Sequence, residues 1–539
     1  MFSRRKYQVF TYYYYVDNPD RWNTDFSELK ENGIQYLVVS EGFDLKNILT
    51  TNAEKEQLIR FLDAADAQDL SCILNPGNPR ELYLLPDARR WRIDYIRHVA
   101  ETLGDHPAVY ALMLEDAPTG GANAGLERWK AVTTELEGRI ESDNLTGDGY
   151  QHAVKRWQMK QYADYTEEMV GVIKKASPRL KTTISFRMAA LFPNQTLVHY
   201  QNTARHLDFV MIDAGSGWQG DPHEGRYLPR FLTNVATELV NKAVWIIIGS
   251  HVEQSRYQPE LRDIREWAQQ VMDQGAFGVG WRGWDASHWS DQHTVRGVPM
   301  AQSKQVCWET ILSLSQNAAA AVPVDNKAAS HACLLSYDAF INQLSMADCF
   351  VPNLILGEEV KLPLAYATDT QIMDGKGLEK RKVLFTTPCP SVRGDIVDRL
   401  LKFMNNGGWI IGSADDFAMN QQLIPSDARS RLFGIQQETP IFHDDRILLS
   451  VGFEYLPEGA SLATAWHRSR LTECDDTVRT LARWGDKSPA ILITPHGKGG
   501  ALYIGTDPYR AALTSENRTD WRRFLQAISD PDTLKDLTT

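Results

Sequence analysis

The sequence lacks the cysteine patterns and the long apolar runs that mark several protein classes. Its 539 residues include six cysteines, and no pair has the CxxC spacing of a zinc knuckle or a redox motif. We expect free, mostly buried thiols at these positions: Cys72, Cys307, Cys333, Cys349, Cys389 and Cys474. No apolar run reaches the roughly 18 residues that a membrane-spanning helix needs. Neither a disulfide framework nor a membrane span is therefore expected.

An excess of positive charge is also missing. The formal net charge is -12 and the sequence pI is about 5.6, whereas nucleic-acid-binding proteins normally carry a basic footprint. Residues 1–6 are basic but lead into polar tyrosines rather than an apolar signal-peptide core. We expect no nucleic-acid or membrane partner, and the location stays open between cytoplasm and periplasm.

Motifs for nucleotides, esterases and metals are absent as well. The chain has no GxxxxGK[ST] phosphate loop and no GxGxxG opening an early strand. Gly215-Ser216-Gly217 does not match the GxSxG nucleophile elbow. Histidines and carboxylates do not show a metal-ligand spacing. The sequence therefore predicts no cofactor and no metal.

What the chain does have, from residue 7 to about 313, is an alternation of strand-like and helix-like segments. Helical periodicity covers residues 52–70, 157–176 and 260–274. Eight apolar segments of strand length lie between such helices: residues 8–15, 34–40, 71–74, 108–114, 181–186, 209–212, 243–248 and 277–281. Because alternating strands and helices form right-handed βαβ units, eight of them predict a (β/α)8 TIM barrel over residues 1–314.

A second α/β pattern follows a linker at residues 315–330. Residues 331–336, 351–356, 382–386 and 408–412 are apolar and of strand length, and residues 395–404 form an amphipathic helix. Residues 490–494 and 501–505 predict a hairpin, and residues 521–528 a closing helix. We expect a flavodoxin-like α/β domain over residues 331–539.

The most informative segment is the fourth predicted strand, whose apolar run from Val109 to Leu114 ends in Glu115-Asp116. Carboxylates at the carboxyl end of a barrel strand lie where α/β barrels keep their chemistry. Glycoside hydrolysis needs two carboxyl groups, one protonated as the acid and the other acting as nucleophile or base. We therefore predict Glu115, Asp116 and Glu253 as catalytic, with Glu115 as acid/base and Glu253 as nucleophile or base.

The ends of the other strands supply polar and aromatic side chains suited to a sugar. The tryptophans at positions 218, 281 and 284 would form a platform for a sugar ring. The predicted substrate-binding residues are Tyr13, Glu41, Asn75, Arg187, Asp213, Trp218, His251, Trp281, Arg282, Trp284 and Asp285.

Three passages resemble the family-42 beta-galactosidases of glycoside hydrolase clan A. Residues 162–186 resemble the helix that leads into strand five of that family, and residues 272–287 resemble its strand eight. The third passage, residues 383–412 together with 496–508, resembles the glutamine-amidotransferase-like domain that follows its barrel. The resemblance implies a glycosidase with a TIM barrel and a retaining mechanism, its acid/base on strand four and its nucleophile Glu on strand seven.

The sequence departs from that family at both catalytic positions. Strand four ends in Leu114-Glu115-Asp116 without the Asn that the family places before its acid/base, and strand seven ends in Gly249-Ser250 with Glu253 further on. The zinc-binding cysteines of some members are missing. Galactosidase specificity is therefore not expected to carry over.

In the second domain, Cys389 lies between two prolines and outside the GxCxG elbow of working amidotransferases. That domain is therefore expected to be non-catalytic and to support a homo-oligomer, a dimer or a trimer.

We thus interpret the chain as a glycoside hydrolase acting on an oligo- or polysaccharide. Two alternatives remain open at this point. The barrel would bind a glycan without cleaving it if its nucleophile has been lost, which the displaced Glu253 favours. Alternatively, it would be a uronate polysaccharide lyase, with Tyr as base and Arg neutralising the uronate charge.

Overall fold

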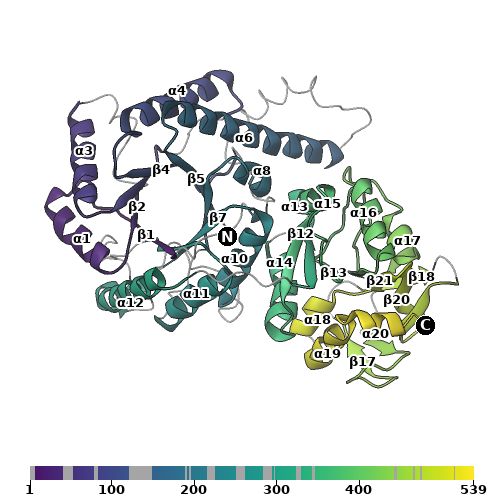
Figure 1. The fold of residues 1–539 in the computed structure, drawn as a ribbon. Coiled ribbons are helices and arrows are strands. Elements are labelled where there is room, and N and C mark those ends of the chain that lie inside the picture. The colour runs from purple at the N-terminus through teal and green to yellow at the C-terminus, as the bar shows by residue number, and fades with distance from the viewer. Residues whose placement is uncertain are drawn as a thin grey trace. The chain divides into compact units, whose positions relative to one another are not determined.

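The protein is described from a computed structural model (Figure 1). The structure describes residues 6–39, 52–77, 83–120, 148–187, 191–192, 196–214, 225–249, 261–282, 294–295, 298–322, 329–342, 346–441, 446–464, 468–473, 476–514 and 516–538. The chain divides into two compact units: the first holds Met1–Glu141 and Arg156–Asn326, the second Ser142–Lys155 and Lys327–Thr539.

The first unit is a closed barrel of eight parallel strands, in the order of the sequence. The strands are β1 (Gln8–Tyr12), β2 (Tyr36–Val39), β3 (Ser71–Leu74), β4 (Val109–Asp116), β5 (Lys181–Arg187), β6 (Phe209–Asp213), β7 (Ala243–Ile248) and β8 (Gly278–Trp281). β8 pairs with β1 and closes the ring. The predicted (β/α)8 barrel is confirmed, with strand ends shifted by at most a few residues.

Helices surround the barrel strands (Figure 1). They are α1 (Pro19–Glu31), α3 (Asn52–Ala67), α4 (Pro86–Leu103), α6 (Asp148–Ala176), α8 (Tyr200–Ala204), α10 (Leu228–Leu239), α11 (Leu261–Asp273) and α12 (Met300–Ala320). Helices α1, α4 and α10 have a proline at one of their first two positions, where its fixed φ suits the first turn and its missing N–H costs nothing. α12 includes residues 315–320 of the predicted linker, and Thr294–Val295 pairs with Val298–Pro299 as β9 and β10 just before it.

The amino-terminal half of the barrel interior is filled with aromatic rings. Trp245 lies 5.4 Å from Phe10 and 4.5 Å from Phe209, measured between ring centroids. The neighbouring strand β8 makes room for them with glycines: a Cβ on Gly280 would lie 2.3 Å from the Phe10 ring, and one on Gly278 2.5 Å from Trp245. Because aromatic rings fill this half among the described residues, we expect a ligand at the carboxyl ends of the strands.

The second unit is built on a mixed nine-stranded sheet in the order β12-β11-β13-β14-β21-β20-β19-β16-β17. Its strands are β11 (His331–Leu335), β12 (Leu364–Thr368), β13 (Val383–Thr386), β14 (Trp409–Ser413), β16 (Arg446–Leu449), β17 (Ser461–Ala463), β19 (Arg479–Trp484), β20 (Pro489–His496) and β21 (Gly499–Ile504). The first five in spatial order are parallel and follow the flavodoxin order 2-1-3-4-5. Strands β15 (Ile435–Pro440) and β18 (Ser469–Glu473) form a separate antiparallel pair.

The helices of this unit are short, apart from α16 and α19. They are α13 (Tyr337–Asn342), α14 (Met346–Asn353), α15 (Asp369–Met373), α16 (Gly394–Asn405), α17 (Ala428–Phe433), α18 (Pro508–Thr514), α19 (Arg518–Ile528) and α20 (Pro531–Asp536). The predicted hairpin of β20 and β21 and the predicted helices α16 and α19 are confirmed.

One predicted strand of this unit is wrong. Residues 351–356 belong to α14 and to the π-helix Leu354–Glu359 that continues it, and the second strand of the sheet is instead Leu364–Thr368. The run is buried almost throughout. A short run that is apolar on every side suits a buried helix as well as a buried strand, so periodicity could not separate the two.

Two further expectations concern cysteines and membranes. Cys72, Cys333, Cys349 and Cys389 are free and buried, while the side chains of Cys307 and Cys474 lie outside the described set. Within the described ranges, no helix is both long and apolar enough to cross a bilayer.

Candidate active site

The two carboxylates that end β4 lie on opposite faces of the strand. Met113 belongs to the cluster that fills the barrel interior and pairs with Thr183, whereas the next registered pair is Asp116 with Ser185. β4 thus has one more residue than β5 between these pairs, which is a β-bulge. The extra residue turns Asp116, and not Glu115, toward the barrel axis.

Asp116 is joined at the mouth by Arg282, which follows β8, and by Asp213, which ends β6. Arg282 Nη2 lies 2.5 Å from Asp213 Oδ2 and 3.7 Å from Asp116 Oδ1. The side chains are only 9%, 9% and 14% exposed for Arg282, Asp213 and Asp116. The guanidinium carbon lies 4.9 Å from the centre of the Tyr12 ring, a cation–π contact. The buried guanidinium of Arg282 therefore forms ion pairs with both carboxylates, Asp116 and Asp213.

Other polar side chains reach the same end of the barrel from neighbouring strands. Arg187 ends β5, pairs in register with Asp213 and is exposed. Asn75 follows β3 and is buried, and its Oδ1 accepts the Gly77 N–H at 2.9 Å. The Tyr14 hydroxyl donates to the Arg282 carbonyl at 2.6 Å. The structure thus brings the predicted residues Asn75, Asp116, Arg187, Asp213 and Arg282 to one end of the barrel.

The environment of Asp116 favours its protonated form. Burial raises the pKa of Asp116 above its ordinary value, and the neighbouring Asp213 adds to the rise. Arg282, the Ser185 hydroxyl and Arg187 act in the opposite direction without cancelling it. A carboxyl that keeps its proton nearer to neutral pH is what a general acid requires.

Glu115 is not at the mouth, contrary to the prediction. It is 5% exposed and lies on the helix side of β4, where Arg92 of α4 and Tyr162 of α6 interact with it. Burial raises the pKa of Glu115 to about 7, while Arg92 and Tyr162 lower it. Arg92 is itself held by the Leu114 carbonyl at 3.0 Å. Because the strand separates it from the barrel axis, Glu115 cannot touch a sugar at the mouth.

Two predicted substrate-binding residues are also placed elsewhere. Tyr13 packs against Phe26 and Phe61 outside the barrel, and its hydroxyl donates to Asp25 Oδ2 at 2.8 Å. Trp281 is fully buried, and its indole N–H donates to Ser315 Oγ of α12 at 2.9 Å. Alternate residues of a barrel strand face opposite sides. Tyr12 and Arg282, the sequence neighbours of these two, therefore face inward.

Six predicted residues lie outside the described residues and stay predictions: Glu41, Trp218, His251, Glu253, Trp284 and Asp285. Three residues near the site were not predicted, namely Tyr12, Tyr14 and Ser185. The alternation of Tyr12–Tyr15 was visible in the sequence, but which phase faces inward depends on the barrel register.

Comparison with solved structures shows which known proteins share this fold. The chain has the fold of family-42 beta-galactosidases. A GH42 beta-galactosidase from G. stearothermophilus matches with a TM-score of 0.74 and 16% identity over 98% of this chain and 88% of that one. The beta-galactosidase from Bacillus circulans sp. alkalophilus matches at 0.71 and 12%, with the same two shares. An exo-beta-1,4-mannosidase from Opitutaceae bacterium strain TAV5 matches at 0.65 and 12%, over 97% and 96%. No protein-family model and no curated protein matches the sequence.

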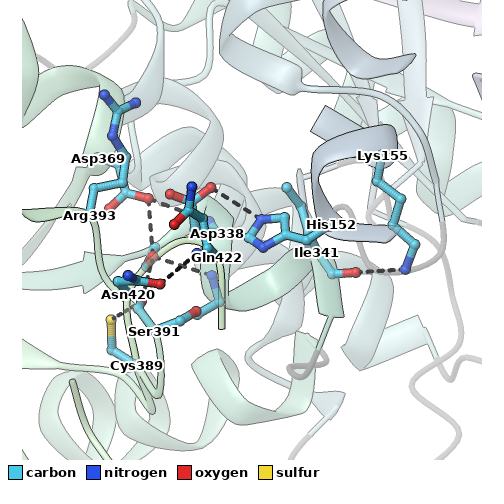
Figure 2. A network of polar contacts seen from close by, with 12 residues as sticks. His152, Lys155, Asp338, Ile341, Asp369, Cys389, Ser391, Arg393, Asn420 and Gln422 are labelled. Carbon is cyan, nitrogen blue, oxygen red and sulfur yellow. Dashed lines mark hydrogen bonds and ion pairs between the residues drawn. The ribbon is translucent and has the colours of Figure 1, made fainter. Parts of the chain in front are cut away.

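In the second unit of this beta-galactosidase-like fold, a buried polar network lies at the carboxyl ends of β11 and β12 (Figure 2). The Ser336 hydroxyl donates to Asp369 Oδ2 at 3.0 Å, and Asp338 Oδ1 lies 3.4 Å from Nε2 of the fully buried His152. Burial and the charge of Asp338 raise the pKa of Asp369 to about 7. Lys155, on the same helix as His152, donates to the Ile341 carbonyl at 3.0 Å.

Cys389 lies beside this network but is poorly suited to catalysis (Figure 2). It is fully buried, and burial raises the pKa of its thiol well above the ordinary value, with Asp416 adding to the rise. Its Sγ contacts the Ser391 carbonyl at 3.5 Å. A reactive cysteine needs an accessible thiolate. Among the described residues, no group of three or more His, Cys, Asp or Glu could hold a metal ion in either unit.

Proposed function

We propose that the chain is a glycoside hydrolase that cleaves a glycosidic bond of an oligo- or polysaccharide at the barrel mouth. One observation carries the proposal: Asp116 is a buried carboxyl with a raised pKa, at the carboxyl end of a barrel strand, beside Arg282 and Asp213. The likeness of the fold to beta-galactosidases and a mannosidase supports the reaction class.

Asp116 takes the role of general acid in this proposal, in place of Glu115. Protonated Asp116 gives its proton to the leaving oxygen, and a second carboxylate attacks the anomeric carbon or activates a water. Glu253 remains the candidate for that second group. Asp213 is less suited to it, because its close ion pair with Arg282 occupies one carboxylate oxygen. We propose retention of configuration as the outcome if Glu253 acts as nucleophile.

Substrate binding is proposed for the polar residues that share this end of the barrel. Arg187 is exposed and free to turn toward a sugar hydroxyl, and Asn75 is held by its own turn. Trp218 and Trp284 remain the candidates for a sugar platform, since Trp281 is buried against α12. Glu41, His251 and Asp285 complete the proposed set.

The lyase alternative is less well supported. A tyrosine that acts as base works best when its pKa is lowered toward the operating pH. Tyr12, the inward-facing tyrosine of β1, has a pKa raised well above its ordinary value by burial and by Asp116. A hydrolase driven by carboxyl groups therefore fits the mouth better than a lyase driven by Tyr12.

Substitution of the two adjacent carboxyls tests the assignment. In Asp116→Asn we expect kcat/KM on an alkyl or oligosaccharide glycoside to fall by about 100-fold or more, with a smaller loss on a dinitrophenyl glycoside that leaves without a proton. Glu115→Gln serves as the matched control and should lose far less activity. Full activity in Asp116→Asn would overturn the role of Asp116. Binding of glycans by the wild type without any hydrolysis would favour the non-catalytic barrel instead.

For the second unit we propose a non-catalytic, assembly role. The buried, protonated Cys389 supports this, because an amidotransferase needs an exposed thiolate. We propose a homodimer or homotrimer, which light scattering coupled to size-exclusion chromatography would measure. A monomer at micromolar concentration would contradict that assembly role.

A further inference from the structure

The second unit carries a groove of about 640 Å³ at the amino-terminal edge of its parallel strands. Its apolar lining includes Trp409 at the start of β14, Ile372 of α15 and Phe403 of α16. In open α/β sheets, active sites lie at the opposite, carboxyl-terminal edge of the strands. This groove is therefore separate from the network of Asp338 and Asp369.

Positive charge dominates the lining of the groove. Seven cationic residues line it against two acidic ones, Glu379 and Asp532, in a chain whose net charge is -12. Six of the seven are Lys376, Lys382, Arg399, Lys402, Lys498 and Lys535. All six are exposed, and the seventh, Arg381, donates to the Ala329 carbonyl. The lining of this groove is therefore positively charged although the chain as a whole is acidic.

Other charged residues in and next to helix α16 form ion pairs, whereas the two cations of α16 that line the groove do not. Asp395 of α16 pairs at 2.6 Å with Arg393, which precedes the helix, and Asp398 of α16 pairs with Arg431 at 2.5 Å. Arg399 and Lys402, on the same helix, form no ion pair with any of the described residues. Cations held close together repel one another. An anion bound among them would remove that repulsion.

Helix dipoles explain only part of the cluster. Lys402 and Lys535 lie in the last turns of α16 and α20, where a cation is favourable. Lys382 precedes β13 and Lys498 lies in the turn between β20 and β21, so neither is at a helix end. Helix dipoles therefore do not explain why Lys382 and Lys498 line the same groove as the other cations.

Close backbone packing holds the turn that carries Lys498. A Cβ on Gly499 would lie 2.0 Å from the Gly408 carbonyl oxygen, and a Cβ on Gly408 would lie 2.3 Å from the Phe403 ring. The Lys498 N–H donates to the Asn405 carbonyl at 3.3 Å, which ties the hairpin turn to the end of α16. These contacts hold the turn that carries Lys498 against the end of α16.

The volume of the groove, the charge of the chain and the position of its exposed apolar side chains limit which ligands the groove could bind. The volume of about 640 Å³ lies within the roughly 300–1,000 Å³ of small-molecule sites. A long nucleic acid would be repelled by the acidic remainder of the chain. The exposed large apolar side chains of the described surface, which a membrane would need, do not line the groove: Trp91, Val322, Ile424, Leu448 and Tyr455.

We propose that this groove binds an acidic oligosaccharide, a segment of polysaccharide whose sugars carry carboxylate or sulfate groups. The anionic groups pair with the lysines and Arg399, outside the barrel mouth. The sugar part of this assignment rests on the proposed function, and the anionic part rests on the groove alone. The site would hold an acidic polysaccharide on the second unit, independently of cleavage.

Calorimetric titration of the full-length protein at low salt tests the site. The ligands are an oligogalacturonate, a sulfated oligosaccharide of equal length, a neutral oligosaccharide of equal length, and tripolyphosphate. We expect one or both acidic oligosaccharides to bind, with affinity that falls as salt rises, and the neutral one to bind at least tenfold more weakly. Which acidic ligand binds identifies carboxylate or sulfate as the recognised group.

The groove variant K376E/K498E should weaken binding at least tenfold, and the neutral variant K376Q/K498Q should weaken it less. The matched control K361E/K487E changes exposed lysines that do not line the groove and should stay within twofold of the wild type. Unchanged affinity in K376E/K498E, equal affinity for the neutral ligand, or tighter binding of tripolyphosphate than of either oligosaccharide would each overturn the proposal.

The same titration in Asp116→Asn separates the two proposals. Groove binding should persist in that variant while hydrolysis is lost. If the wild type binds an acidic oligosaccharide through the groove but cleaves no glycoside, the proposed function fails and the site stands. If it cleaves glycosides and no acidic oligosaccharide binds, the groove proposal fails alone.

Discussion

The guanidinium of Arg282 donates to the carboxylate of Asp213, with Nη2 2.5 Å from Oδ2, at the mouth of the barrel. The same nitrogen lies 3.7 Å from Asp116 Oδ1. These residues come from β4, β6 and β8, so the contact joins alternate strands across the barrel mouth. Of the two ion pairs that this nitrogen forms, the one with Asp116 is the longer.

Arg282→Gln should therefore change the pH dependence of activity as well as the stability. Arg282 lowers the pKa of Asp116, so its removal raises that pKa and moves the alkaline limb of kcat/KM to higher pH. Two buried carboxylates would lose their cation, which costs about 3–5 kcal/mol of unfolding free energy. The measurements are a pH–rate profile and urea unfolding.

The exposed Arg187→Gln is the control for Arg282→Gln. Its effect on the unfolding free energy should stay within about 0.5 kcal/mol, because an exposed side chain leaves no buried charge behind. Equal pH profiles in the wild type and Arg282→Gln would show that Arg282 does not act on the titrating group.

Glu115→Gln should alter how stability depends on pH. The pKa of Glu115 is raised to about 7 in the folded protein and is about 4.3 in an unfolded chain. Between these values the folded state holds more protons than the unfolded state, so stability falls as pH rises through this window. The fall is at most about 4 kcal/mol for this group.

Thermal unfolding at pH 5 and pH 8 measures this effect. The loss of Tm from pH 5 to pH 8 should be smaller in Glu115→Gln than in the wild type, since Gln carries no titrating proton. A wild-type loss that the variant reproduces in full would assign the pH dependence to other groups.

Two buried aspartates of the second unit should respond differently to neutralisation. Asp369 and Asp416 both have a pKa raised to about 7 by burial. Asp369 lies beside the carboxylate of Asp338 and accepts hydrogen bonds from the Ser336 hydroxyl and the Asp338 N–H through Oδ2. Asp416 accepts backbone N–H groups through both oxygens, from Ser413 at Oδ2 and from Cys389 at Oδ1.

Asp369→Asn should therefore be neutral or stabilising at pH 8, because it removes repulsion with Asp338. Asp416→Asn should destabilise the protein by about 1–3 kcal/mol at every pH, because an amide NH₂ placed against those donors leaves buried groups unpaired. Chemical denaturation at pH 5 and pH 8 measures both. A larger loss in Asp369→Asn than in Asp416→Asn at pH 8 would contradict this account.

Gly280→Ala should destabilise the barrel, whereas Gly171→Ala should not. A Cβ on Gly280 would lie 2.3 Å from the Phe10 ring, while nothing lies within 4 Å of a Cβ on Gly171 in α6. We expect a loss of about 1–3 kcal/mol from overpacking in Gly280→Ala. Gly171→Ala should gain about 0.5–1 kcal/mol, because alanine loses less backbone entropy in a helix. Urea unfolding of both variants measures the difference.

Much of the barrel could be predicted because its strands are short, apolar and separated by helices of clear periodicity. β3 and β7 were predicted with the ends that the structure gives them. The second unit was harder, since residues 351–356 are buried as a helix on all sides. Its second strand, Leu364–Thr368, was missed.

The candidate site could be predicted only as a set of strand ends. A run ending in two carboxylates placed both Glu115 and Asp116 at the end of β4, but not on a face. A bulge between Met113 and Asp116 decides that face, because one extra residue reverses every side chain after it. The same alternation sends Tyr13 and Trp281 outward and their neighbours inward.

The sequence by itself determined the order of strands and helices, and with it the eight-stranded barrel. The spacing of apolar residues along the chain indicates which segments are strands or helices and which of their residues are buried. Only the tertiary structure decided that Asp116 and Asp213 share Arg282 and that Glu115 lies behind the strand. It also decided that His152 meets Asp338 and that seven cations line one groove. Those relationships depend on register and on contacts across long stretches of chain, which no local pattern encodes.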